Sequence, residues 1–458
     1  MRMLFGTDGI RGVAGDPPLD HNTVFAVGAA LGRYLRQHHE DLEVVIGQDT
    51  RESSAWICDS ITSGLCWAGA RVKHAGVITT PGVAFLARQA FSSGVVISAS
   101  HNPWTDNGIK IFSHDGYKLP DELEEQIETD IFDLLHGRAP ELKSIPAANA
   151  SPEPAMATDP VLLRQYVDWL AATVTGTSFG SVRVLVDCAN GAATPVAHEV
   201  FRACGIEADF INDQPNGRNI NENCGALHPE VVAKRVAASG GKYDLGITFD
   251  GDADRALFAC KQGKVVNGDA VLLLTGRELK AHGKLAQETI VATTMSNMGL
   301  EIALRTSGIR MLRAGVGDKY VLEQMQKTGA VLGSEQSGHI IFRDGDATTG
   351  DGLLTALRVL QVIQSSGKSL GELVADLKVF PQVVKNIRVR EKKAFDQVPE
   401  ISSAIKSAEE QLAGNGRIVV RYSGTEALAR VMVEAESESQ MKQLTEQIAG
   451  AIQKTLGV

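Results

Sequence analysis

Apolar and polar residues alternate along this chain in the repeating order typical of buried strands and amphipathic helices. In the first predicted helix, 23–38, apolar residues recur at helical spacing, for example Val24, Val27, Leu31 and Leu35. The segments that follow are predicted as strand, helix, strand and strand: 44–49, 55–67, 71–75 and 95–98. Apolar strands that alternate with helices indicate α/β layers.

The same order begins again at two later positions. V-R-V-L-V-D at 182–187 and T-I-V-A-T-T at 289–294 are both predicted strands. Three such starts indicate related α/β units, although their unequal separations make the repeat weak. The last part differs, because it is predicted as a strand, a helix, two strands and a helix: 383–389, 401–413, 417–422, 428–434 and 438–455. That order is typical of a small α+β domain.

Length and proline positions set the predicted domain boundaries. At about 150 residues per domain, a chain of 458 residues suggests about three domains, with two or four as the alternatives. Five of the fifteen prolines lie between Pro140 and Pro160, which favours a linker there. We place boundaries near 155, 256 and 372. The predicted domains are 1–155, 156–256, 257–372 and 373–458.

Composition narrows the class of protein. Hydrophobic residues make up 43% and charged residues 22%, which excludes a wholly disordered chain. The net charge of −10 argues against binding to nucleic acid or to anionic membranes. The six cysteines form no C-x-x-C pair, the N-terminus resembles no signal peptide, and no apolar run is long enough for a membrane helix. We therefore expect a cytoplasmic protein whose ligands are small molecules.

Three carboxylates follow a predicted strand in D-G-D-A-D-R, 250–255. Asp250, Asp252 and Asp254 would repel one another unless a cation neutralised them. A solvated polar turn is the alternative. An EF-hand is excluded, because Arg255 and Lys261 occupy its glycine and bidentate glutamate positions. The pattern favours a compact site for Mg²⁺, which takes few carboxylates and completes its shell with phosphate or water oxygens.

A second polar loop follows the strand at 95–98, in S-A-S-H-N-P. Ser100 and His101 lie just beyond the strand, where ligands bind in α/β sheets, and Lys110 returns on the next strand. A polar turn is again the alternative. A phosphate carried on Ser100 would need a nearby cation and a base within reach, and this region has candidates for both.

Two further loops are predicted to bind anions or hydroxyl groups. The first loop connects two predicted strands and contains Arg421, Ser423, Gly424 and Thr425. Its backbone N–H groups could hold a phosphate with help from Arg430. The loop G-S-E-Q-S-G-H, 333–339, offers groups suited to sugar hydroxyls. A hairpin turn and a surface loop are the respective alternatives.

Together the motifs resemble those of the α-D-phosphohexomutase family, in the family's order and across nearly the whole chain. They are T-D-G-I-R-G (7–12), S-A-S-H-N-P (98–103), D-G-D-A-D-R (250–255), G-S-E-Q-S-G-H (333–339) and R-Y-S-G-T-E (421–426). The resemblance implies three related α/β domains with mixed sheets and a C-terminal α+β domain around a central cleft.

The resemblance also implies roles for individual residues. Ser100 would be the phosphoserine, and one of its phosphate oxygens would complete the Mg²⁺ site of Asp250, Asp252 and Asp254. The groups implied around the transferring phosphoryl group are Arg11, His101, Lys110, Arg255 and His339. Those implied to bind the sugar or the distal phosphate are Glu335, Gln336, Ser337, Arg421, Ser423, Gly424, Thr425 and Arg430. The general base stays open among Lys110, His101 and His339.

Within the family, E-Q-S-G-H together with F-G-T-D-G-I-R-G is similar to the members that isomerise glucosamine phosphate for UDP-N-acetylglucosamine and cell-wall synthesis. Sugar 1,6-bisphosphate would be the activator, and the protein would be a monomer or homodimer. A phosphomannomutase/phosphoglucomutase is the alternative enzyme, and a sugar-phosphate-binding regulator without turnover is the alternative from another class. Ser334, Tyr422, Ala427 and Gln48 depart from the family's usual residues without removing a catalytic group.

Overall fold

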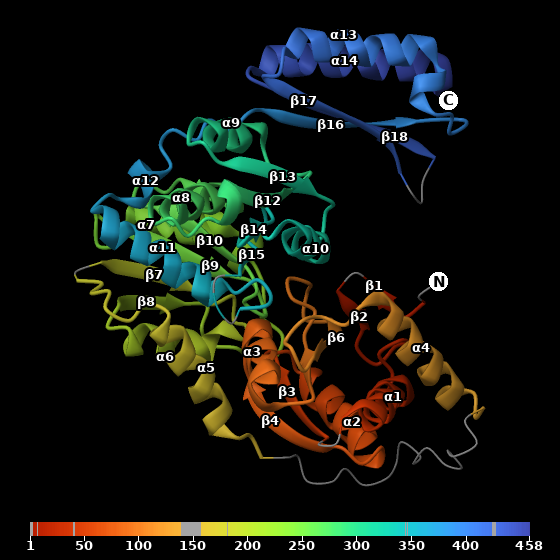
Figure 1. The fold of residues 1–458 in the computed structure, drawn as a ribbon, viewed down its shortest axis with the longest axis vertical. Helices are drawn as coiled ribbons and strands as arrows, with labels where there is room; N and C mark the ends of the chain where they lie inside the picture. Colours follow the sequence, from red (N-terminus) through yellow and green to blue (C-terminus); the bar gives the residue numbers. More distant parts are fainter. Residues whose placement is uncertain are drawn as a thin grey trace. The chain divides into compact units, whose positions relative to one another are not determined.

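The structure is a computed structural model in two compact units (Figure 1). It describes residues 3–6, 8–39, 42–138, 157–180, 182–343, 345, 347–423 and 427–458. The larger unit comprises Met1–Met295 and Leu312–Val374, and the smaller comprises Ser296–Met311 and Ala375–Val458. Each unit is described by itself. In the described part of the chain, no helix has both the length and the apolar character needed to span a bilayer.

The first α/β domain is built on a six-stranded mixed sheet. Its strands are β1 Phe5–Gly6, β2 Gly9–Val13, β3 Glu43–Gln48, β4 Arg71–Val77, β5 Ser93–Ile97 and β6 Asp106–Ser113, and its helices are α1 His21–His38, α2 Ser54–Trp67, α3 Thr80–Ala90 and α4 Asp121–Leu135. The strand order is β1-β2-β6-β5-β3-β4. Strands β3, β4 and β5 are parallel, whereas β6 is antiparallel to β5 and β2. Strand β6 therefore returns beside the loop that follows β5.

The two faces of this sheet differ in what covers them. Ile109 and Ile111 of β6 are buried in one core with residues of α1, α2 and α4. Because side chains alternate along a strand, Lys110 between them points to the opposite face. Helix α3 packs on β3, β5 and β6, outside that core. Lys110 is therefore buried because of its position on the strand, since a charged side chain does not favour the interior by itself.

The second domain repeats the pattern with five strands. Its elements are α5 Pro160–Ala172, β7 Arg183–Asp187, α6 Ala193–Ala203, β8 Glu207–Ile211, η1 Gly225–Leu227, α7 Pro229–Ala238, β9 Leu245–Phe249, β10 Ala256–Cys260 and β11 Val265–Val266. The order is β11-β10-β9-β7-β8, with β8, β7 and β9 parallel and β10 antiparallel to β9. The D-G-D-A-D-R loop connects β9 to β10, as its sequence predicts.

The third domain has four strands in the order β13-β12-β14-β15. Its elements are α8 Gly268–Ala281, η2 Ala286–Glu288, β12 Thr289–Thr293, β13 Arg310–Ala314, α10 Asp318–Thr328, β14 Leu332–Ser334, β15 Ile340–Phe342, α11 Gly352–Ser366 and α12 Leu370–Leu373. Strand β12 is parallel to β14, and β15 is antiparallel to β14. The loop from β14 to β15 carries the predicted sugar-binding residues.

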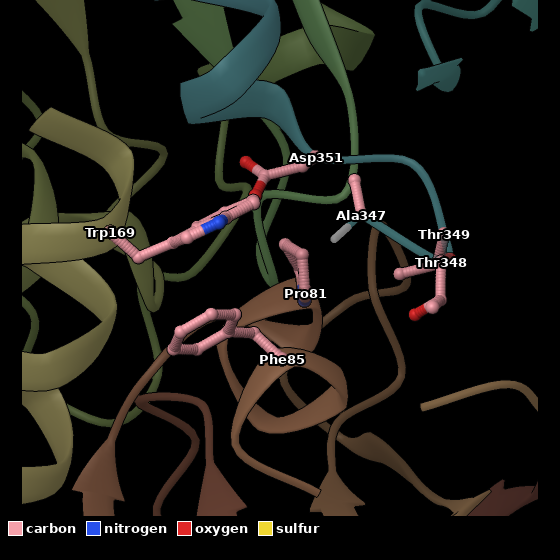
Figure 2. A pocket seen from close by; sticks show the side chains of 7 residues that line it. All are labelled: Pro81, Phe85, Trp169, Ala347, Thr348, Thr349 and Asp351. Carbon is pink, nitrogen blue, oxygen red and sulfur yellow. The ribbon is translucent and has the colours of Figure 1, made fainter. Parts of the chain in front are cut away.

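A buried junction joins these three domains (Figure 2). Phe85 of α3 stacks on Trp169 of α5, with ring centroids 4.7 Å apart. Tyr166 donates a hydrogen bond of 2.7 Å to Asp351, which also caps α11 by accepting from Leu354 N at 2.9 Å. The remaining cavity is about 10 Å³, room for at most one water molecule. Burial raises the pKa of Asp351 to about 6.

The smaller unit has a simpler, wholly antiparallel sheet. Its elements are α9 Met298–Thr306, β16 Gln382–Arg388, η3 Phe395–Gln397, α13 Pro399–Leu412, β17 Gly416–Tyr422, β18 Leu428–Ala435 and α14 Glu438–Leu456. The strand order is β16-β18-β17, and α13 and α14 run side by side over one face of the sheet (Figure 1). Ile401, Leu444 and Ile448 are fully buried between helices and sheet.

The predicted fold class is confirmed: three α/β domains with mixed sheets precede a C-terminal α+β domain. The predicted helices and strands are present, with ends shifted by one or two residues; the helix predicted over 23–38, for example, is His21–His38. The predicted proline-rich linker lies largely outside the described residues, and the exact domain boundaries stay predictions.

Candidate active site

Ser100 lies in the loop after β5 in an unusual backbone conformation. Its φ angle is +53°, in the left-handed region that non-glycine residues seldom occupy. The side chain is 1% exposed, and Oγ donates a hydrogen bond of 2.6 Å to Asp250 Oδ2. The Nδ1 atom of His101 lies 3.4 Å from the same Oγ. The conformation therefore aims the hydroxyl at the carboxylate loop of the second domain.

A set of buried polar residues holds the Ser100 loop in place. Asp49 accepts hydrogen bonds from Ser98 Oγ at 2.7 Å and from Arg51 Nε at 2.8 Å. Arg51 in turn donates to the carbonyl oxygens of Ser100 and Asn102 at 2.8 and 2.9 Å. Asn221 of the second domain donates to the Ser100 carbonyl at 2.9 Å. The sequence alone did not identify Asp49, Arg51 and Asn221, because they lie far from Ser100 along the chain.

The three aspartates of the 250–255 loop converge in the interior. Asp250, Asp252 and Asp254 each offer an oxygen within 4.8 Å of the others, and all three are buried. Burial, with the charges of the other two, raises the pKa of Asp250 well above its usual range. Burial also opposes ionisation of Asp254, but the charges of Lys110 and His339 outweigh it and hold that pKa well below its usual range.

The arrangement fits a hard divalent cation. Oδ1 of Asp252 is buried without a hydrogen-bond partner among the described residues. An unpaired buried carboxylate oxygen is costly unless a cation lies against it. Three converging carboxylates form the kind of oxygen-only donor set that Mg²⁺ prefers, with positions left for phosphate or water.

Lys110 connects the two loops through ion pairs. Its Nζ atom lies 2.7 Å from Asp252, 3.1 Å from Asp8 and 3.5 Å from Asp254. Burial favours the neutral amine, but these carboxylates outweigh it and raise the pKa of Lys110 above its usual value. These carboxylates therefore hold Lys110 as a cation.

Thr80 is a second anchor that the sequence did not reveal. Its Oγ1 donates to Asp252 Oδ2 at 2.6 Å, and its backbone N–H donates to the Asp252 carbonyl at 3.0 Å. Thr80 begins α3, so these two hydrogen bonds attach the first domain to the carboxylate loop of the second. Ala253 in that loop has φ +54°, and Gly352 N donates to its carbonyl at 2.9 Å. Contacts from the first and third domains thus fix the strained turn.

The predicted cations lie around this cluster. Arg255 Nε lies 3.7 Å from Asp254 Oδ1, and nearby carboxylates outweigh burial and raise its pKa. Arg11 pairs with Asp8 and donates to the Ala99 carbonyl at 3.4 Å. Burial, together with the charges of Arg255 and Arg11, lowers the pKa of His101. Of the three candidate bases, His101 is the one whose pKa is lowered.

His339 reaches the cluster from the third domain. Its Nδ1 lies 3.6 Å from Asp254, and its Nε2 lies 3.6 Å from Asp318. Gly350 N donates to Nε2 at 3.0 Å, which leaves Nδ1 to carry the ring proton of the neutral form. Burial lowers the pKa of this imidazole, but the carboxylates outweigh burial and raise it to about 9.

The predicted sugar loop lies beside His339 and is partly exposed. Glu335, Gln336 and Ser337 are each of intermediate exposure. Glu335 Oε1 accepts a hydrogen bond of 3.0 Å from Gly317 N, and Gln336 Nε2 donates to Asp269 at 3.1 Å. The larger unit thus brings together the predicted serine, aspartate, lysine, arginine and histidine residues, with the sugar loop next to His339.

The predicted phosphate loop belongs to the smaller unit. Arg421 of β17 and Arg430 of β18 are directly opposite each other, so both side chains lie on one face of the sheet. Like charges in such a pair are destabilising unless an anion offsets them. Lys392 Nζ donates to the Ser423 carbonyl at 2.7 Å and adds a cation that sequence reasoning missed. Gly424 and Thr425, also predicted to bind phosphate, lie outside the described residues.

Tyr422 departs from the family's usual residue at this position, and the structure accounts for it. Its ring stacks on Phe395 with centroids 4.3 Å apart, and its hydroxyl donates to the Lys393 carbonyl at 2.5 Å. The side chain therefore packs against its own unit.

Models of the four phosphoglucomutase/phosphomannomutase domains match the chain in order. The α/β/α domains I, II and III match residues 2–136, 164–263 and 267–380, and the C-terminal domain matches 385–451. A phosphoglucosamine mutase of Koribacter versatilis (strain Ellin345) is 60% identical over 461 residues, with 100% of this chain and 98% of that protein covered. One from Solibacter usitatus (strain Ellin6076) is 51% identical, with 99% of both covered.

Solved structures share the fold. A phosphoglucomutase/phosphomannomutase family protein of Burkholderia thailandensis aligns with a TM-score of 0.78 at 23% identity, over 99% of this chain and 98% of that one. Aspergillus fumigatus N-acetylphosphoglucosamine mutase, solved in complex with GlcNAc-6P and magnesium, aligns with a TM-score of 0.65 at 20% identity over 99% and 96%.

Proposed function

This chain belongs to the phosphoglucomutase/phosphomannomutase family, and from that premise we propose that it interconverts glucosamine 6-phosphate and glucosamine 1-phosphate. The observation that carries the proposal is the hydrogen bond of 2.6 Å from Ser100 Oγ to Asp250, in a buried cluster of three aspartates and Lys110. Full-length relatives called phosphoglucosamine mutases, at 60% and 51% identity, support the choice of sugar.

The reaction we propose proceeds in two transfers. In the first, the bond between Oγ of phosphorylated Ser100 and phosphorus breaks as the free hydroxyl oxygen of a sugar monophosphate bonds to that phosphorus. The hydroxyl proton passes to a base, and Oγ takes up a proton as it leaves. The resulting sugar 1,6-bisphosphate turns over. In the second, the bond between phosphorus and the sugar's other phosphorylated oxygen breaks as Ser100 Oγ bonds to that phosphorus. Oγ gives up its proton to a base, and the freed sugar oxygen takes one up. The same bisphosphate, supplied in catalytic amount, would prime unphosphorylated protein.

We assign each residue a role in phosphoryl binding, proton transfer or metal binding from its position in the cluster. Lys110, Arg255 and Arg11 would hold the negative oxygens of the phosphoryl group, because all three are cations beside Ser100 or its aspartates. Lys110, His101 or His339 would move the proton. Asp250, Asp252 and Asp254, with an oxygen of the phosphoserine at position 100, would hold one Mg²⁺. When bound, that ion would neutralise charge on the phosphoryl oxygens.

The two ends of the substrate would bind at different loops. Glu335, Gln336 and Ser337 would contact the sugar's hydroxyl and amino groups. Arg421, Ser423, Gly424, Thr425 and Arg430 would bind the phosphate that is not reacting. Because the 1- and 6-phosphates exchange places during the cycle, the distal loop must accept a phosphate in both orientations of the sugar.

The setting we propose follows from the same chemistry. Reduced thiols suit a cytoplasmic enzyme, and all six cysteines are free. The described chain carries the serine, the aspartates and the basic residues itself, so a monomer would suffice and a homodimer would add no catalytic group. Its product would feed UDP-N-acetylglucosamine and cell-wall synthesis.

Two measurements test the proposal. Intact mass of the purified protein should show a fraction about 80 Da heavier, the phosphoserine form. The ratio kcat/KM, measured with sugar 1,6-bisphosphate supplied, should be higher for glucosamine 6-phosphate than for glucose or mannose 6-phosphate. Equal values, or mannose ahead, would instead assign the chain to the phosphomannomutase/phosphoglucomutase activity of the same family.

A further inference from the structure

The sugar loop is held by a side chain that the mechanism does not use. Gln336 Nε2 donates a hydrogen bond of 3.1 Å to Oδ2 of Asp269. Asp269 lies in the first turn of α8 and is 2% exposed. The partner of Gln336 is therefore a buried carboxylate on a regular helix rather than a group on a solvent-exposed loop.

The start of α8 is docked tightly on the loop that carries Gln336. The backbone N–H of Gly268 donates to the Gln336 carbonyl at 3.1 Å. A Cβ atom at Gly268 would lie 2.1 Å from the Glu335 carbonyl oxygen, so only glycine fits there. This close approach fixes the distance between Asp269 and Gln336, because neither backbone has room to shift.

The chemistry of the pair sets which way the amide of Gln336 faces. A carboxylate only accepts hydrogen bonds, so the NH₂ group of the amide must face Asp269. The amide oxygen Oε1 then faces away from Asp269. It accepts no hydrogen bond from the part of the chain that the structure describes, and Gln336 is partly exposed. Oε1 is thus an acceptor available to a ligand.

We infer that Asp269 is a positioning residue for sugar specificity, acting by holding the Gln336 amide so that its oxygen faces the substrate. The inference rests on the proposed function, in which Gln336 contacts the C2 substituent. A C2 ammonium group only donates hydrogen bonds, so it requires an acceptor. A C2 hydroxyl both donates and accepts, so it pairs with either face of an amide. A fixed acceptor therefore favours the amino sugar selectively.

Asp269→Asn tests this inference while conserving shape. An asparagine can turn its own NH₂ group toward Gln336 and donate to the oxygen of a flipped Gln336 amide, so the orientation is no longer enforced. We expect kcat/KM for glucosamine 6-phosphate to fall about tenfold, the size of one lost hydrogen bond to a charged group. The value for glucose 6-phosphate should change little. A purely structural defect would lower both alike, so the ratio between the two sugars is the readout.

The matched control is Glu278→Gln, at the other end of the same helix. Glu278 also accepts a side-chain hydrogen bond, from Ser365 at 2.9 Å, but it lies in the last turn of α8, whereas the first turn contacts the sugar loop. This variant should keep the wild-type ratio. If the wild type prefers the amino sugar and Asp269→Asn keeps the same ratio between the two sugars, the inference about Asp269 is overturned and the proposed sugar stands. No preference in the wild type would overturn the proposed sugar itself.

A double-mutant cycle separates an indirect role from a direct one. Gln336→Met removes the acceptor, so it should narrow the gap between the two sugars. If Asp269 acts through Gln336, adding Asp269→Asn to Gln336→Met should change the ratio no further. Additive losses would show that Asp269 acts independently and would overturn the positioning role. Should Asp269→Asn fail to fold, Gln336→Asn serves in its place, because its shorter amide cannot hold the same position, and an unchanged ratio there would likewise overturn the inference.

Discussion

The Ser100–aspartate cluster and the Arg421–Arg430 pair both handle phosphate in our proposal, yet they are built in opposite ways. The cluster is buried, and each of its charges has an opposite charge nearby: Lys110 lies 2.7 Å from Asp252, for example. The arginine pair combines two like charges across neighbouring strands, and Arg421 is exposed. One site is a buried network of opposite charges, and the other places two like charges side by side.

The difference follows from what each phosphate does. A reacting phosphoryl group must be aligned with its nucleophile, which calls for strained turns such as those at Ser100 and Ala253 and for contacts from several domains. A phosphate that only anchors the substrate must be accepted in two orientations of the sugar. Two neighbouring guanidinium groups, each with several N–H donors for phosphate oxygens, suit that task.

The largest expected effect is at the nucleophile. Ser100→Ala should lower kcat by roughly four to six orders of magnitude, because the covalent route needs this hydroxyl. The heavier species in the intact mass spectrum should disappear as well. Ser98→Ala is the control for loop damage, since Ser98 supports the loop through Asp49 but lies outside the reaction. Near wild-type kcat in Ser100→Ala would disprove the phosphoserine assignment.

A smaller loss is expected at the metal site. Asp252→Asn keeps an oxygen for Lys110 and Thr80, so the fold should survive. The Mg²⁺ concentration for half-maximal rate should rise at least about tenfold, because a ligand has lost its charge. Titration of activity with Mg²⁺ after EDTA treatment measures this. EDTA-treated wild type that stays fully active would refute the metal site.

At the arginine pair the effect should fall mainly on binding. Arg421→Gln should raise KM about 10- to 100-fold, the range for a lost hydrogen bond between charged groups, with a smaller change in kcat. The matched control is Arg388→Gln on β16, whose cross-strand partner is Leu428. A drop in kcat at unchanged KM would contradict the contrast between the two sites.

The smallest expected effect is on stability, and it tests directly whether Arg421 and Arg430 repel each other. Without phosphate, Arg421→Gln should raise the free energy of unfolding by about 0.2–1 kcal/mol, because it removes repulsion from Arg430. Urea unfolding monitored with and without phosphate measures this, and phosphate should stabilise the wild type more than the variant. Equal stability of both proteins in both conditions would show that the pair is not held in repulsion.

Local sequence signals were enough for the elements and for the loops that carry chemistry. The 3.6- and 2-residue periodicities placed helices such as His21–His38 and strands such as Ser93–Ile97, because each buries one face or both. The runs D-G-D-A-D-R and S-A-S-H-N-P predicted two candidate loops at strand ends, and the fold brings Ser100 of one to Asp250 of the other.

The residues that sequence reasoning missed share one property: their meaning depends on distant partners. Thr80 at the start of α3 and Asn221 in a loop of the second domain are ordinary in their own segments. Only folding brings Thr80 to Asp252 and Asn221 to the Ser100 carbonyl. Asp269 likewise resembles any acidic residue in a first helical turn until the fold places it under Gln336.

The sequence by itself determined the α/β alternation, the C-terminal α+β domain, the serine and the three aspartates, because each depends on residues that are near one another in the chain. Tertiary structure alone decided their electrostatics. Lys110 was a candidate base in the sequence, and in the fold it is a cation because three carboxylates from two domains surround its buried amine. Charge is set by what lies within a few ångströms, and a linear sequence does not contain those distances.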